Sequence, residues 1–270
     1  MIKLAVFDLD DTLLRSDKTL DVETLDTIHT LKARGVEIAI ATGRNIPMSL
    51  PFAKALGASG LLAGNNGSII IDLKSDKVVE EHFVDKTAQK KTIEYCFTND
   101  HPFVIYTKEG VFTPMPDRIS VYEDWNARHP NHSVHYENME TVEALSQLDS
   151  HKVLMIVEDP SVFNATYEHF KNLDDAHVTK SSKHYIDVLP NHISKAYALK
   201  QFMAHYGVSA EETIAFGDSD NDAEMLKLSG TAYAMNNATP LTKASANYVT
   251  AYDNNDAGVA HALKNHFTNL

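Results

Sequence analysis

The chain has little cysteine and no surplus of basic residues. These two features restrict the cellular compartment and the kinds of partner that we expect. Cys96 is the single cysteine among 270 residues, which excludes an internal disulfide and fits a reducing compartment. The 24 Lys and Arg residues are outnumbered by 37 Asp and Glu residues, giving a formal net charge of −13. Nucleic acids and anionic membranes bind basic surfaces, so we expect neither as a partner.

Long apolar runs are also missing. No uninterrupted apolar stretch approaches the roughly 20 residues that cross a bilayer. The chain enters an apolar segment by residue 3, without the basic region and small-residue cleavage site of a secretory signal. We therefore expect a cytoplasmic protein without a membrane partner, and the sequence leaves open whether it is a monomer or a homodimer.

Near the N-terminus, an apolar segment ends abruptly in carboxylates. Residues 3–13 read KLAVFDLDDTL, so Asp8 and Asp10 follow a run typical of a buried parallel strand. Side chains at positions i and i+2 of an extended backbone point to the same side, so these two carboxylates would repel each other without a nearby cation. Hard oxygen ligands in a small space favour Mg²⁺.

Two later segments show the same change from apolar to polar, and an isolated lysine lies between them. Residues 38–44 end in Thr-Gly-Arg, and residues 213–222 run into Gly-Asp-Ser-Asp-Asn-Asp. Lys195 stands at the expected start of a helix. Ligands of open parallel sheets bind at the carboxyl ends of the strands, so these polar groups are expected to meet at one edge.

The ordered set of motifs resembles the haloacid dehalogenase superfamily of phosphatases. The set comprises DxDxT at 8–12, a strand-end threonine, a downstream lysine and GDxxND at 217–222. The sequences ATGR at 41–44, GNNG at 64–67 and Ser-Lys at 194–195 are similar to those of the Cof-type branch, which hydrolyses small phosphate esters. The resemblance covers nearly the whole chain. It implies a doubly wound, Rossmann-like α/β core with a parallel sheet and an inserted α/β cap domain.

The pattern along the chain predicts where the cap is inserted. Residues 1–84 alternate strands and helices, and the same pattern resumes over 186–270, so these two segments are expected to form the catalytic core. Residues 85–185 carry no phosphoryl-transfer motif and are expected to form the cap, which would determine substrate specificity. The elements expected in the cap are strands near 103–106, 111–113 and 153–157 and helices near 86–99 and 160–173.

The resemblance implies a role for each residue of the core motifs. Asp8 would be the nucleophile that forms an aspartyl-phosphate, and Asp10 would protonate the leaving group and then deprotonate water. The Thr42 hydroxyl would donate a hydrogen bond to the phosphoryl group. Lys195 would screen the repulsion between that group and the nucleophile.

The same resemblance implies a magnesium cofactor and a set of substrate contacts. Asp8, the backbone carbonyl of Asp10, and Asp218 would bind Mg²⁺, while Asp222 would support them by orienting water and the lysine. The expected substrate-binding residues are Leu9 and Gly43, through their backbone N–H groups, together with Arg44, Asn66 and Asn221.

The sequence leaves alternatives for the roles of two segments and for the function. Arg44 could instead form a salt bridge at a helix start, and Asn66-Gly67 is typical of a tight turn. The leading function is a Mg²⁺-dependent phosphatase of small metabolites such as a sugar phosphate, a nucleotide or a cofactor phosphate. The alternatives are a phosphosugar mutase or phosphotransferase, and a non-catalytic sensor of a phosphorylated metabolite. The intact acidic motifs and Lys195 favour an enzyme.

Overall fold

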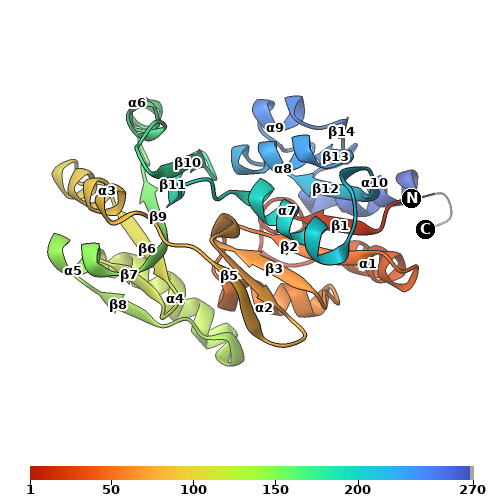
Figure 1. Ribbon diagram of the computed structural model, residues 1–270, viewed down its shortest axis with the longest axis horizontal. Coiled ribbons are helices and arrows are strands. Elements are labelled where there is room, and N and C mark those ends of the chain that lie inside the picture. The colour runs from red at the N-terminus through yellow and green to blue at the C-terminus, as the bar shows by residue number, and fades with distance from the viewer. Residues whose placement is uncertain (268–270) are drawn as a thin grey trace.

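Two β-sheets organise the computed structural model, which describes residues 1–267 (Figure 1). The strands of the larger sheet are β1 (Leu4–Phe7), β2 (Glu37–Ala41), β3 (Leu61–Gly64), β4 (Ile69–Asp72), β5 (Lys77–Glu81), β12 (Thr213–Gly217), β13 (Thr231–Ala234) and β14 (Tyr248–Val249). The helices that accompany it are α1 (Val22–Ala33), α2 (Ile46–Ala55), α7 (Lys195–Tyr206), α8 (Ala223–Leu228), α9 (Pro240–Ala244) and α10 (Gly258–His266). Two short 3₁₀ turns, η1 (Asn65–Gly67) and η4 (Asp220–Asp222), follow strands of this sheet.

The larger sheet has the order β14-β13-β12-β1-β2-β3-β4-β5. The strands from β14 to β3 run parallel, whereas β3, β4 and β5 pair in antiparallel fashion. The first strand lies in the middle of the sheet, because Leu4 pairs with Glu37 on one side and with Thr213 on the other. The predicted α/β core with a parallel sheet is confirmed.

Local sequence signals account for the central strands and for the helix ends. All four residues of β1 are fully buried, as expected for a parallel strand covered on both faces. The Ser194 hydroxyl caps α7 by accepting from the backbone N–H of Tyr197 at 3.3 Å, and Gly207 ends this helix with φ 63°. Thr239 caps α9, whose first residue is Pro240.

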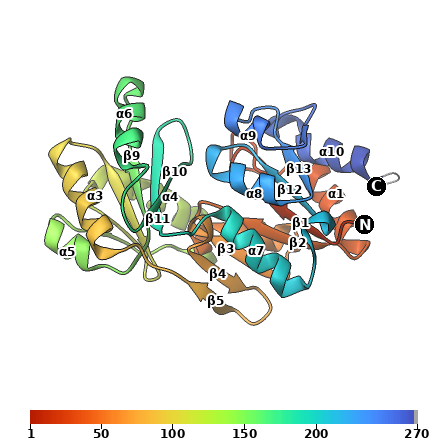
Figure 2. The ribbon, with the colours of Figure 1, turned by 45° about the horizontal axis from the view of Figure 1, so that its top comes forward.

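The smaller sheet has the order β10-β11-β9-β6-β7-β8. Its strands are β6 (Phe103–Thr107), β7 (Val111–Thr113), β8 (Tyr136–Asn138), β9 (Ser150–Ile156), β10 (Ala176–Lys180) and β11 (Tyr185–Pro190). Its helices are α3 (Lys86–Thr98), α4 (Pro116–Arg128), α5 (Val142–Gln147) and α6 (Pro160–Phe170). Figure 2 shows this unit beside the larger sheet, with the chain returning from β11 to α7. We refer to it as the cap.

The structure differs from the sequence-based expectation at the end of the cap. Residues 186–190, which the prediction assigned to the core, form most of β11 and pair with β9 and β10. Ile186, Val188 and Leu189 are buried, and buried apolar residues of this kind carry no information about which sheet their strand joins. We propose that the cap ends at residue 190. The prediction also lacked α4, α5, β8 and β10.

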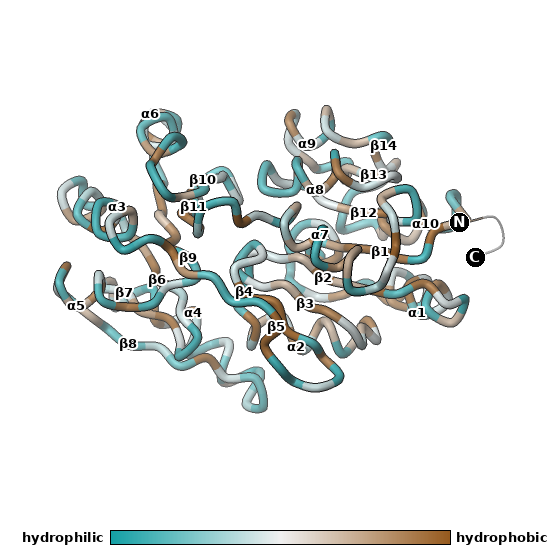
Figure 3. Tube along the Cα trace, in the orientation of Figure 1, coloured by the Kyte–Doolittle hydropathy of each residue, from teal (hydrophilic) through white to brown (hydrophobic). Residues whose placement is uncertain are grey.

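A small apolar cluster around Tyr122 and Trp125 of the cap contacts Met48 and Phe52 of α2, and apart from this contact the core and the cap each have an apolar interior of their own. The larger one surrounds β1, β2, β3 and β12 and includes Phe7, Ile40 and Phe216. The interior that contains Cys96 lies within the cap, between its sheet and helices such as α3. Figure 3 shows the contrast between interior and surface, with β1 apolar and α3 largely hydrophilic. Over residues 1–267, no helix combines the length and the apolar character needed to span a membrane.

Candidate active site

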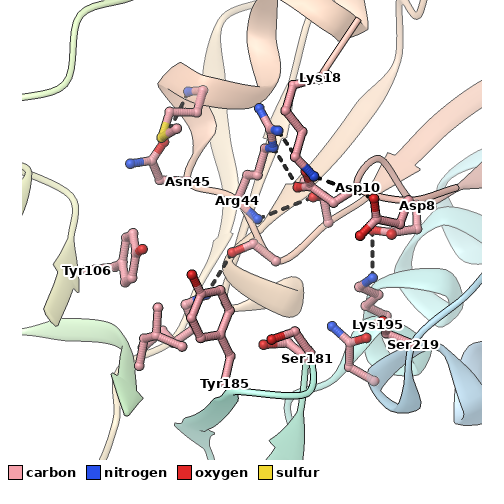
Figure 4. A pocket seen from close by; sticks show the side chains of 18 of the residues that line it. Asp8, Asp10, Lys18, Arg44, Asn45, Tyr106, Ser181, Tyr185, Lys195 and Ser219 are labelled. Carbon is pink, nitrogen blue, oxygen red and sulfur yellow. Dashed lines mark hydrogen bonds and ion pairs between the residues drawn. The ribbon is translucent and has the colours of Figure 1, made fainter. Parts of the chain in front are cut away.

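The predicted catalytic residues line a cavity of about 360 Å³ between the core and the cap. Asp8 and Thr42 directly follow the adjacent parallel strands β1 and β2, which places them at the same sheet edge. The core residues that line the cavity include Asp8, Asp10, Lys18, Thr42, Gly43, Arg44, Lys195 and Asn221. The cap contributes Tyr106, Val121, Tyr122, Lys152, Leu154, Ser181, Ser182 and Tyr185. Figure 4 shows Tyr106 and Tyr185 across the cavity from Asp8 and Lys195.

Lys195, the first residue of α7, is buried between two carboxylates. Its Nζ lies 2.7 Å from Asp8 Oδ1 and 2.7 Å from Asp222 Oδ1. Burial alone would lower the pKa of Lys195, but the charges of Asp222 and Asp8 outweigh burial and raise it. Asp222 Oδ2 accepts from the backbone N–H groups of Asp218 and Ser219, each at 3.1 Å. Lys195 is therefore a fixed cation, and Asp222 holds it beside the predicted nucleophile.

Three buried carboxylates form an acidic cluster at this edge. Oxygen atoms of Asp8, Asp218 and Asp222 lie within 4.8 Å of one another. Burial raises the pKa of Asp8 well above its usual value, and Asp222 and Asp218 add to this effect against the attraction of Lys195. Burial and the charge of Asp222 raise the pKa of Asp218 to about 7. The cluster therefore has more negative charge than Lys195 alone neutralises.

These residues fit a magnesium ion. Carboxylate oxygens are the ligands that Mg²⁺ prefers, and a divalent cation would offset both the burial and the repulsion that raise the pKa values of Asp8 and Asp218. Asn221 lies in the turn between Asp218 and Asp222, and its buried Oδ1 has no hydrogen-bond partner among the described residues, so this turn offers a further oxygen acceptor. Asp222 is already engaged with Lys195 and two backbone amides, which suits it to a supporting position rather than to direct ligation.

The Asp10 carboxylate lies outside this cluster and pairs with two cations. Arg44 Nε and a terminal guanidinium nitrogen donate to its two oxygens at 2.6 and 2.7 Å, and Lys18 Nζ lies 3.0 Å away. Burial would raise the pKa of Asp10, but the hydrogen bonds and charge of Arg44, followed by those of Lys18, outweigh burial and lower it. Asp10 is therefore an ionised acceptor in this conformation, and donating a proton requires Arg44 to release it. Arg44 both forms a salt bridge and lines the cavity.

The residues predicted to bind the phosphate, the substrate or the metal occupy two layers. Thr42 and Gly43 line the cavity at the end of β2, whereas Leu9, Asn66, Asp218 and Asp222 do not line it. The Leu9 carbonyl accepts from the N–H groups of Leu13 and Leu14 at 3.0 and 2.8 Å, which closes the turn after β1. Asn66 is fully buried, and its amide contacts neighbouring side chains.

The turn that carries Asn66 packs directly against the start of α7. Asn65, Asn66 and Gly67 have φ values of 47°, 59° and 100°, so the tight turn expected from Asn-Gly is present. A Cβ atom on Gly67 would lie 2.7 Å from the Ser194 carbonyl oxygen. The glycine therefore allows this turn to approach the residue that precedes Lys195.

Sequence reasoning missed Lys18 and the charged residues that the cap contributes. Lys152 and Asp187 both lie in buried strands: Lys152 directly precedes the apolar residues 153–156 of β9, and Asp187 lies between Ile186 and Val188 of β11. A charged residue inside or directly beside an apolar run is a detectable signal, because such residues are almost never fully buried unless they are paired. The sequence did not indicate which face of the cap sheet lies against the core, so no partner could be assigned.

Comparisons with known proteins agree with this geometry. Residues 5–263 match the family model described as haloacid dehalogenase-like hydrolase. The phosphatase YwpJ of Bacillus subtilis is 25% identical over 284 residues, covering 97% of this chain and 99% of YwpJ. Another B. subtilis relative, named 5-amino-6-(5-phospho-D-ribitylamino)uracil phosphatase YitU, is 29% identical over 277 residues, covering 98% of this chain and 97% of YitU.

A solved structure extends the similarity to three dimensions. A haloacid dehalogenase-like hydrolase from Bacteroides thetaiotaomicron has a TM-score of 0.80 and 25% sequence identity, covering 99% of this chain and 100% of the other. Because the match covers both chains almost completely, it includes the cap as well as the core.

Proposed function

Because the chain belongs to the haloacid dehalogenase-like hydrolase family, we propose that it is a Mg²⁺-dependent phosphatase acting through an aspartyl-phosphate. It is a phosphoric monoester hydrolase of small metabolites, in line with relatives named as phosphatases. The observation that carries the proposed mechanism is the buried contact of 2.7 Å between Asp8 and Lys195 at the edge of the cavity.

In the proposed reaction, an Asp8 carboxylate oxygen attacks phosphorus and the bond from phosphorus to the alcohol oxygen breaks. The alcohol leaves with a proton from Asp10, whose carboxylate must first be freed from Arg44 and protonated. Water then attacks the phosphorus of the aspartyl-phosphate while Asp10 accepts a proton, which releases inorganic phosphate and regenerates Asp8. Two displacements replace one difficult hydrolysis.

The surrounding residues stabilise the negative charge that the reaction concentrates. Lys195 is held by Asp222 beside the attacking carboxylate, so its position needs no rearrangement during the reaction. Thr42 offers a hydroxyl at the cavity wall to a phosphoryl oxygen. When bound, Mg²⁺ would supply further positive charge to offset the cluster of Asp8 and Asp218.

The cap side of the cavity supports a ring-bearing alcohol as the leaving group. Tyr106, Tyr122 and Tyr185 line it together with Leu154. The hydroxyls of Tyr106 and Tyr122 lie 3.1 Å apart, and burial raises the pKa of Tyr122 to about 12, so that it remains a neutral hydroxyl. Aromatic side chains bind flat rings through stacking or edge-to-face contacts. The name of YitU, which includes a uracil ring, points to the same class of substrate.

A phosphate-release assay tests the proposed function. The protein should release inorganic phosphate from ring-bearing phosphate monoesters, such as nucleoside monophosphates, more efficiently than from simple sugar phosphates. EDTA should abolish this activity and Mg²⁺ should restore it. Asp8→Asn should reduce turnover by at least about 1,000-fold, because the amide is a poor nucleophile.

Four outcomes would contradict parts of this proposal. Full activity in metal-free protein would exclude the magnesium requirement, and turnover by Asp8→Asn close to that of wild type would exclude the covalent route. Transfer of the phosphoryl group to a sugar without phosphate release would favour a mutase. Tyr185→Ala should remove the preference for ring-bearing esters, and an unchanged preference would place specificity elsewhere.

A further inference from the structure

Two charged side chains of the cap are buried against the core outside the acidic cluster. Lys152 is 4% exposed and Asp187 is fully buried, although both charges would be well solvated at a protein surface. Lys152 Nζ lies 3.4 Å from Asp187 Oδ1, which has no hydrogen-bond partner among the described residues. Burying an ion pair usually contributes little net stability, so its presence at this contact calls for another explanation.

Lys152 reaches from β9 to the peptide that follows Gly43. Its Nζ donates to the Gly43 carbonyl oxygen at 2.8 Å. The N–H at the other end of the same planar peptide belongs to Arg44, and it donates to Thr42 Oγ1 at 3.2 Å. This donor occupies one acceptor position of the Thr42 oxygen, so the hydroxyl hydrogen is available to an acceptor in the cavity. Lys152 thereby fixes the plane of the peptide that orients Thr42.

Asp187 reaches the same threonine by a second route. Its Oδ2 accepts from Asn66 Nδ2 at 2.7 Å, and Asn66 Oδ1 accepts from Asn221 Nδ2 at 2.9 Å. The backbone N–H of Asn66 donates to the Thr42 carbonyl oxygen at 2.8 Å. The two ends of the cap ion pair therefore contact the two loops that hold Thr42 in place.

We propose that Lys152 and Asp187 are positioning residues that orient the Thr42 hydroxyl toward the phosphoryl group. The cap then affects the rate of phosphoryl transfer itself, in addition to selecting the alcohol. This inference rests on the proposed phosphatase function. The proposed role differs from that of a residue that only attaches the cap to the core. Substituting a residue of that kind would have an effect that does not depend on Thr42.

A double-mutant cycle between Lys152 and Thr42 tests the proposal. The variants are Lys152→Met, Thr42→Val and their combination, assayed with para-nitrophenyl phosphate and Mg²⁺. The ester is the same for all four proteins, so contacts of its ring with the cap tyrosines cancel in the cycle. Lys152→Met should lower kcat about 10-fold or more with KM within about twofold, as expected for lost orientation. In the Thr42→Val background the same substitution should cost less than about twofold, because the hydroxyl it orients is absent.

The controls separate orientation from folding. Lys152→Met leaves Asp187 without its cation, so Lys152→Met with Asp187→Asn provides a variant that buries no unpaired charge and should show the same loss of kcat. Lys86→Met is the matched control, because Lys86 also donates to cap backbone carbonyls and pairs with an aspartate, Asp149, but contacts only the cap. It should leave kcat within about twofold of wild type.

The outcomes are distinguishable from a failure of the proposed function. If wild type hydrolyses the ester and the Lys152→Met loss is equally large with and without Thr42, the positioning role is wrong. If wild type hydrolyses no phosphate ester, the proposed function fails. In that case, amide hydrogen exchange of the segment 42–46 tests whether Lys152 orders this segment through Gly43. Faster exchange in Lys152→Met than in Lys86→Met supports the contact through Gly43, and equal exchange overturns it.

Discussion

At the scale of single residues, the site depends on one buried cation between two carboxylates. Lys195→Met would leave Asp8 and Asp222 facing each other without compensation. We expect a loss of about 3–5 kcal/mol in unfolding free energy, typical of breaking a buried ion pair. We also expect kcat to fall by at least about 100-fold, as for removal of one electrostatic stabiliser. Urea denaturation and phosphate release measure the two effects.

The same helix provides a control for this substitution. Lys200 is exposed on α7, so Lys200→Met removes one lysine without touching the carboxylates. It should leave both stability and kcat nearly unchanged. A Lys195→Met protein with wild-type stability would show that the two carboxylates do not depend on this ammonium group.

The raised pKa of Asp218 predicts a pH-dependent response to magnesium. Its pKa is about 7 in the folded protein against an ordinary 3.8, so the folded state binds a proton more tightly than the unfolded state does. The resulting stabilisation is complete below the unfolded pKa and is lost as pH rises through about 7. In the proposed function Mg²⁺ binds the ionised Asp218 carboxylate, so it should replace the proton above that pH.

Thermal melts at about pH 5.5 and about pH 8 test this linkage. The rise in Tm caused by Mg²⁺ should be larger at the higher pH. Asp218→Asn, which cannot ionise, should respond weakly to Mg²⁺ at both pH values. An equal rise at both pH values in wild type would show that Asp218 does not bind the ion as an ionised group.

At the scale of elements, the approach of η1 to α7 predicts different costs for two glycine substitutions. Gly67 and Gly35 have φ values of 100° and 86°, so Ala is strained at both positions. The added Cβ would lie 2.7 Å from the Ser194 carbonyl in one case and within 4 Å of nothing in the other. Gly67→Ala should therefore destabilise the protein by about 1–3 kcal/mol more than Gly35→Ala, as overpacking does.

This pair of variants also reports on the active site. Moving the Ser194 carbonyl displaces the start of α7 and with it Lys195, so Gly67→Ala should lower kcat. Gly35→Ala should retain it. The expectation fails if the two variants lose equal stability in urea denaturation and keep equal turnover.

The core elements and their motif residues were predictable because each follows from a local signal. Asp8 and Thr42 end apolar strands, and Ser194 caps the helix that carries Lys195. By contrast, no helix was predicted at α4, although Pro116 occupies its first helical position, where proline needs no N–H partner. The contacts of Lys152 and Asp187 depend on how two sheets face each other, and no local pattern contains that information.

At the scale of the whole molecule, the two apolar interiors predict separable unfolding. Cys96 is buried in the cap interior, and burial raises the pKa of its thiol to about 12, so a thiol reagent should label it only when the cap opens. Mg²⁺ binds at the core edge in our proposal. It should therefore shift the urea midpoint of the far-UV circular dichroism more than the midpoint of Cys96 labelling.

A single cooperative unit would behave differently. Circular dichroism and Cys96 labelling would then share one midpoint, and Mg²⁺ would shift both equally. Cys96→Ser, which lacks the thiol, controls for labelling at other groups.

The central place of β1 also has a consequence for biosynthesis. Leu4 pairs with Glu37 soon after both have left the ribosome, but its other neighbour, Thr213, is translated only after the entire cap. The nascent core therefore carries an unpaired strand edge for most of translation, and such edges invite association with other chains. The cap is continuous in sequence, so it can fold in the meantime. We expect chaperones to bind the nascent chain mainly at the edge of β1 that is still unpaired.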